Sequence, residues 1–234
     1  MFNICLVTTI GLMVSGCNYF NCIEGSGNQI SDSRKVEPFT YVETSGSIKL
    51  VLKQGQQDLR IVADDNIIKE IRTKVSGNTL KIDVDGNFCN TGQITVYLSS
   101  QSYEGVDVSG AVEIVSDGLL QLKDFELQLS GSSKVNLNLN AANVRTQSSG
   151  ASEIFLKGQA SSHEVELSGS SSIDALDFVV GKYRIESSGA SNSKINVLSD
   201  LRVKSSGASD VEYRGNPSNV SNDDSGASSV RKIK

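Results

Sequence analysis

The stretch Thr146-Gln147-Ser148-Ser149-Gly150-Ala151-Ser152-Glu153-Ile154 contains a short motif, Ser-Gly followed by Ala or Ser, that recurs through the second half of the chain. The motif glycines are Gly110, Gly131, Gly150, Gly169, Gly189, Gly207 and Gly226. Successive glycines are 21, 19, 19, 20, 18 and 19 residues apart. A unit of this length cannot bury an apolar face by itself, so the units must stack on one another as a solenoid.

Apolar residues that alternate with polar ones flank each motif, which is the pattern of a half-buried strand. Val106 and Val108 precede Gly110, and Ile114 follows it by four residues. One turn of a parallel β-helix fits the spacing, with two or three short strands per rung. We expect the motif glycines to form the rung corners, because glycine tolerates the positive φ that a sharp corner needs.

The first half also has the alternation of β-strands, as in Leu80-Lys81-Ile82-Asp83-Val84. Ser76-Gly77-Asn78 predicts a hairpin turn, and residues 64–71 predict a short helix capped by Asp64 or Asp65. Thr44-Ser45-Gly46-Ser47 is an earlier copy of the motif that stands apart from the series. We therefore predict an all-β chain, a parallel β-helix-like solenoid with rungs of about 19–20 residues and one short helix in its β-rich N-terminal half.

The N-terminus has the features of a lipoprotein signal peptide. An apolar segment from Ile4 to Val14 leads into Val14-Ser15-Gly16-Cys17, which resembles the bacterial lipobox, although Met1-Phe2-Asn3 lacks a basic residue. We expect residues 1–16 to be the signal peptide, 17–36 the lipidated Cys17 and a tether, and 37–234 the solenoid domain, repeat-rich from about 105. The alternative is a buried apolar strand that includes an incidental cysteine.

Two of the four cysteines remain available for pairing after processing. Cys5 lies in the leader and Cys17 would carry lipid, so Cys22 and Cys89 are left. An exported compartment favours oxidation, and we predict a disulfide between them. No Cys/His spacing supports a zinc site, so we expect no metal and no cofactor.

Several of these segments together resemble one family, the auto-transporter adhesin head domain or GIN domain. They are Glu24-Gly25-Ser26-Gly27-Asn28, residues 39–47, Ala63-Asp64-Asp65-Asn66-Ile67-Ile68 and the Ser-Gly repeats. The resemblance covers about residues 25–234. It implies a right-handed β-helix-like fold in exported Gram-negative proteins, often lipoproteins, and brings no catalytic residues.

A polar column precedes the motif glycines by three residues and is a candidate binding face. Its acids are Asp107, Glu166 and Glu186, and Gln128, Gln147 and Lys204 occupy the same position in other units. Carboxylates on neighbouring rungs could bind a cation or a sugar, and the alternative is an ordinary solvated surface. His163, the only histidine, is expected in a solvent-exposed loop at a rung corner.

These features predict a non-catalytic, adhesin-like or ligand-binding lipoprotein of the outer membrane, on its periplasmic or its cell-surface side. The membrane, through the lipid anchor, and an unidentified glycan or protein are the expected partners. A net charge of −5 without a basic patch argues against nucleic acid. The alternatives are a periplasmic structural or envelope-stress scaffold and a polysaccharide-processing enzyme. The last unit ends at Val230 with little cap, which predicts self-association.

Overall fold

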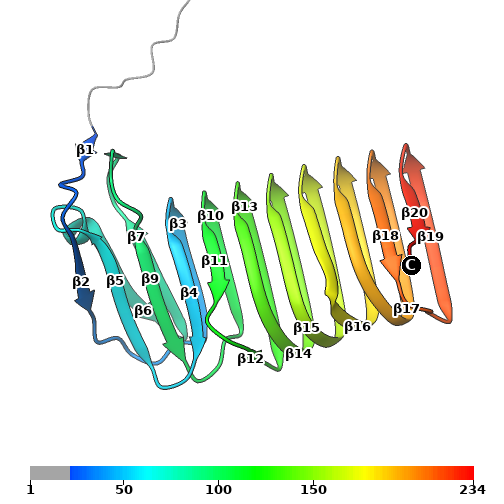
Figure 1. The fold of residues 1–234 in the computed structure, drawn as a ribbon, viewed down its shortest axis with the longest axis horizontal. Helices are drawn as coiled ribbons and strands as arrows, with labels where there is room; N and C mark the ends of the chain where they lie inside the picture. Colours follow the sequence, from blue (N-terminus) through cyan, green and yellow to red (C-terminus); the bar gives the residue numbers. More distant parts are fainter. Residues whose placement is uncertain (1–21) are drawn as a thin grey trace, which may run out of the picture.

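The computed structural model describes residues 22–234, so the expected signal peptide and Cys17 lie outside the described residues. The chain forms a flattened β-solenoid whose rungs stand side by side (Figure 1). The solenoid has about seven turns with rungs of about 19 residues, which confirms the predicted fold class.

Each rung has two sides. We call the strands that lead into the motif glycines the first wall and those that follow the glycines the second wall. The first wall contains β3 (Tyr41–Gly46), β10 (Gly105–Gly110), β13 (Asp124–Gly131) and β19 (Asn219–Gly226). The second wall contains β4 (Lys49–Gln54), β11 (Glu113–Ser116), β12 (Leu120–Gln121), β18 (Asp210–Arg214) and β20 (Ser229–Lys232).

Four long strands belong to both walls. They are β14 (Lys134–Gly150), β15 (Glu153–Gly169), β16 (Ser172–Gly189) and β17 (Asn192–Gly207). Each begins in the second wall, bends, and ends at a glycine in the first wall. All pairings between successive rungs are parallel and keep the glycines opposite one another.

The motif glycines form the rung corners that the sequence predicts. Their φ angles lie between 93° and 121°, a region that side chains other than glycine rarely adopt. Gly46 belongs to the same column, because Gly110 pairs with it in register although the two are 64 positions apart in the sequence. That intervening segment closes the N-terminal end of the solenoid.

At this end both walls are extended, first by a strand that pairs in parallel and then by strands that pair antiparallel. The first wall gains β7 (Thr79–Val84), parallel to β3, and then β6 (Ile71–Ser76); the second gains β9 (Thr95–Ser100), parallel to β4, and then β5 (Asp58–Asp64) and β2 (Gln29–Ser33). β1 (Ile23–Glu24) pairs with β8 (Phe88–Cys89). The part of the expected tether from Cys22 onward therefore belongs to the folded unit.

The helix expected over residues 64–71 is wrong. Only the 3-10 turn η1 (Ile68–Glu70) forms, and its N-cap residue Ile67 makes no side-chain capping bond. Asp64 ends β5, and the isoleucines of this segment are buried in a tight connection to β6 that covers the end of the core. The predicted hairpin is confirmed, since Ser76 pairs with Thr79.

The core is a row of aliphatic side chains between the walls, each stacked on its equivalent in the next rung. Two residues before the glycines, the column holds Val108, Leu129 and Leu167 but also Ser148, Ser187 and Ser205, all buried. In the last rung the equivalent inward residues Asn222 and Asp224 are exposed. The final rung thus covers the core below it with polar side chains.

Candidate functional site: a polar groove on the first wall

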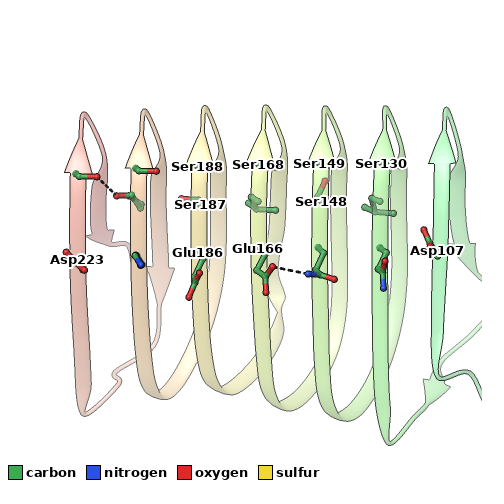
Figure 2. Close-up of a pocket in the computed structure, with 18 residues that line it drawn as sticks. Asp107, Ser130, Ser148, Ser149, Glu166, Ser168, Glu186, Ser187, Ser188 and Asp223 are labelled. Atoms are coloured by element: carbon green, nitrogen blue, oxygen red, sulfur yellow. Dashed lines mark hydrogen bonds between the residues drawn. The ribbon is translucent and has the colours of Figure 1, made fainter.

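A groove of about 780 Å³ runs across the strands of the first wall, close to the glycine corner. Figure 2 shows its lining as two parallel rows of side chains on successive strands, one of carboxylates mixed with other polar side chains and one of serines. Between the rows lie residues such as Leu129, Ser148 and Leu167, whose side chains are buried. The floor of the groove is therefore main chain.

The row farther from the corner is the polar column that the sequence predicts. Register pairing aligns Asp107, Gln128, Gln147, Glu166, Glu186, Lys204 and Asp223. The row nearer the corner consists of Ser130, Ser149, Ser168, Ser188, Ser206 and Ser225. Strand spacing places one polar side chain about every 4.8 Å along each row.

The predicted pair Glu166 and Glu186 occupies neighbouring strands in register, but two arginines neutralise it. Arg145 donates to Glu166 at 2.6 Å, and Gln147 donates to the same carboxylate at 2.9 Å. Arg184 donates to Glu186 at 2.7 Å, and this bond lowers the pKa of Glu186. The pair belongs to an ion-pair network in which both arginines also contact Glu164, and it is not an open cation site.

Asp107 lies apart from this network, at the N-terminal end of the groove. Partial burial, Glu43 and Glu126 all raise its pKa. Beside it the ring of Tyr41 packs over Gly105, where an added Cβ would come 2.2 Å from the ring. Burial and the surrounding carboxylates raise the pKa of Tyr41 to about 12. The N-terminal end of the groove therefore combines an aromatic ring with acidic side chains.

The sequence reasoning missed Arg145 and Arg184, which control the charge of the groove. Both stand five residues before their glycines, and Glu126, Glu164 and Arg202 share this column. Because side chains on a strand alternate between faces, residues three and five before a glycine lie on the same outer face. The two-residue alternation of the strands could therefore have placed both arginines on the groove side of the first wall.

The groove can hold an extended polar chain that crosses the strands. It offers amides, hydroxyls and paired charges at a regular repeat. Within residues 22–234, no group of three or more His, Cys, Asp or Glu side chains is placed to hold a metal ion. No helix in that part of the chain is long and apolar enough to cross a membrane.

A match to a known family model identifies the family of this chain. The model of the family described as "Putative auto-transporter adhesin, head GIN domain" matches residues 38–217. The chain belongs to the head GIN domain family. No curated protein is similar enough to the chain to count as a match.

Solved structures share the GIN domain fold. A putative adhesin from Bacteroides fragilis superposes with a TM-score of 0.79 at 20% identity, covering 90% of this chain and all of that one. A putative lipid binding protein from Parabacteroides distasonis gives 0.72 at 18% identity, covering 91% of this chain and 99% of that one. A putative adhesin from Parabacteroides merdae gives 0.65 at 16%, covering 92% of this chain and 100% of that one. At these identities the likeness shows the fold alone.

Two of the segments that carry the family resemblance, residues 24–28 and 63–68, meet at the N-terminal end of this GIN domain. Ser26 donates its backbone N–H to the Asn66 side chain at 3.0 Å, and Asn66 donates to the Glu24 carbonyl at 2.7 Å. Buried Asp64 accepts the backbone N–H groups of Gly27 and Gly92 at 3.2 and 3.3 Å. We call this group of contacts the knot. It fixes the N-terminal arm to the connection before β9.

A disulfide joins Cys22 to Cys89 beside the knot. The two cysteines are those that the sequence leaves available, and they are 67 residues apart. β1 pairs with β8 at the same place, so covalent and hydrogen-bonded contacts coincide.

The expectation that His163 is an exposed loop residue is wrong. The side chain is 1% exposed and points into the core of the GIN domain, between Phe178 and Tyr183. Its Nε2 lies 2.9 Å from the Thr146 hydroxyl. Burial lowers the pKa of His163 to about 3, so the ring is neutral at physiological pH. His163 lies within a strand of the first wall, where it pairs with Val144, and not in a corner. The Ser-rich local sequence was the reason for expecting a loop.

Proposed function

We propose that the chain is an exported, lipid-anchored binding module of the bacterial envelope, adhesin-like and without catalytic activity. The observation that carries the proposal is the groove, with its two polar rows at strand spacing. The ligand class that suits it is an extended polyhydroxylated chain such as a glycan, lying across the strands. Membership of a family described by the word adhesin supports a role at the cell envelope.

The charge state of the groove supports binding over catalysis. General acid–base chemistry on a glycosidic bond uses two carboxyl groups with different pKa values. Arg145 is hydrogen-bonded to Glu166 and Arg184 to Glu186, and the second of these bonds lowers the pKa of Glu186. Glu186 is therefore not held in the protonated form that a general acid needs.

Binding is tested with two substitutions on one strand. Gln147→Arg places a long side chain in the groove, whereas Asn136→Arg places one on the exposed side of the second wall. On an array of bacterial and host glycans, soluble protein from residue 18 should bind at least one extended glycan. We expect Gln147→Arg to weaken that binding tenfold or more and Asn136→Arg to leave it unchanged. Equal loss in both variants, or no binding by the parent, would contradict the proposal.

The anchor is tested separately through Cys17. In cells expressing the full chain, Cys17→Ser should move the protein from the membrane fraction to the soluble fraction. The parent chain should incorporate labelled palmitate, and the variant should not. A parent protein that carries no lipid would refute the anchor while leaving the groove proposal standing.

A further inference from the structure

The N-terminal arm, residues 22–33, lies across the N-terminal end of the solenoid, at the place where the chain enters the fold (Figure 1). Its longer strand, β2, pairs with β5 alone and is mostly exposed. A pull on the start of such an edge strand opens its hydrogen bonds one after another, because only the outermost bond carries the force at any moment.

The disulfide changes where such a pull enters the fold. Cys22 precedes β1, so a force from the N-terminal side reaches the sulfur bridge before it reaches the arm. Through the bridge it passes to Cys89, in the connection between β7 and β9. β7 belongs to the first wall and β9 to the second, and each pairs with strands on both sides.

The knot holds the same connection from the other direction. Gly92, three residues after Cys89, donates its N–H to the buried carboxylate of Asp64 at the end of β5. Gly25 cannot be enlarged, since an added Cβ would lie 2.2 Å from that carboxylate and 2.7 Å from the backbone of Thr91. The main chains of the arm and the connection thus pack against each other, and the Asp64 side chain joins both to the end of β5.

We propose that the disulfide is a mechanical clamp, which divides a pull from the membrane anchor between both walls and keeps it off the edge strand β2, while the knot packs the same connection against the end of β5. The proposal rests on the anchored role proposed above. The chain has only four residues between Cys17 and Cys22. A ligand held in the groove would therefore load the clamp almost directly through the anchor, across a span of at most about 18 Å.

Single-molecule pulling tests the clamp on the soluble protein from residue 18, held at its two ends. The disulfide-bonded protein should show no extension step before the solenoid unfolds. The double variant Cys22→Ser/Cys89→Ser should show an additional early step of about 4 nm, at lower force, as the twelve residues of the arm detach. An identical first step in both proteins would overturn the proposal.

A second variant separates the bridge from the knot. Asn66→Ala removes two hydrogen bonds of the knot and leaves the disulfide in place. It should lower thermal stability but add no early step, because the force still bypasses the arm. An early step with the disulfide intact would overturn the proposal. If the cysteine variant does not fold, adding dithiothreitol to the folded parent protein during the measurement replaces it.

The pulling result does not depend on lipid. A failed Cys17 experiment together with the early step would refute the anchor and leave the clamp as a property of the domain. A lipidated protein without the early step would refute the clamp alone.

Discussion

At the scale of single residues, the rung corner depends on glycine for two separate reasons. Gly150 has a φ of 121°, and an added Cβ would stand 2.3 Å from the carbonyl oxygen of Gly131 in the preceding rung. The first reason is backbone strain in any other residue, and the second is the close approach of stacked main chains. Gly118 shares only the first, with a φ of 93° and open space around it.

This difference gives a matched prediction. Gly118→Ala should lower the free energy of unfolding by about 1–2 kcal/mol, because alanine is strained in the left-handed region of φ. Gly150→Ala should cost about 3 kcal/mol or more, because the rungs must also separate. Urea denaturation measures both. Equal losses would mean that the stacking contact at the corner carries no energy.

His163 makes the stability of the fold depend on pH. Its folded pKa is about 3 and an unfolded histidine titrates near 6.5, so between these values only the unfolded chain takes up the proton. The contribution of neutral His163 is complete above pH 6.5 and is lost as the pH falls. The slope approaches about 1.4 kcal/mol per pH unit.

His163→Leu should remove this slope. The variant loses the hydrogen bond to Thr146 and starts from a lower stability, so the informative quantity is the change between pH 7 and pH 5. Urea denaturation across that range should show a steep decline in the parent and a shallower one in the variant. Parallel curves would show that the buried ring does not control the acid sensitivity.

At the scale of elements, the last rung combines an unpaired edge with polar inward residues. Val203 and Ser205 of the preceding rung are buried beneath Asn222 and Asp224, which are themselves exposed. Inward-pointing charge on an edge strand opposes pairing with another chain. The self-association expected from the sequence would have to bury these groups.

We therefore expect Asn222→Val/Asp224→Val to associate end to end more strongly than the parent protein. Sedimentation velocity over a range of concentrations measures the difference. Asn192→Val, an exposed position on the second wall away from the edge, is the control for added apolar surface. A double variant no more associated than this control would contradict the capping role.

The sequence pattern predicted the repeated strands and corners correctly. The prediction failed in the N-terminal half, where a long segment separates one copy of the motif from the others. The regular spacing of the glycines predicted the rungs and their corners, because every unit has to bury its apolar face in the same way. Gly46 looked isolated because 64 residues separate it from Gly110, and only the folded chain stacks the two. Ile67, Ile68 and Ile71 have helical spacing, but tertiary packing leaves only the short turn η1 in this segment, which propensity alone could not predict.

The groove was predictable only in part. Asp107, Glu166 and Glu186 lie in the expected column, because strand alternation determines which side faces outward. Their different charge environments were not predictable. Arg145 reaches Glu166 across one rung, whereas Arg184 bonds Glu186 on its own strand. Which carboxylate an arginine bonds depends on side-chain geometry and not on the sequence repeat.

At the scale of the whole molecule, one rung is a separable unit. Residues 134–141 and 143–150 pair one to one with 153–160 and 162–169, without a bulge. Deleting residues 151–169 would place β14 against β16 with the glycine column intact. We expect the shortened protein to fold cooperatively and to be shorter by about 4.8 Å, the spacing of one strand. Thermal unfolding and small-angle scattering would measure this, and a molten or aggregated product would contradict it.

The in-register stack also bears on how such proteins diversify. Unequal recombination within the coding sequence would add or remove whole turns, and each such event would preserve the corners and the buried columns on either side. The length of the groove would therefore change by a fixed increment while the N-terminal end of the solenoid stayed the same. Relatives built this way would differ in the number of ligand units that they span before they differ in the chemistry of any single turn.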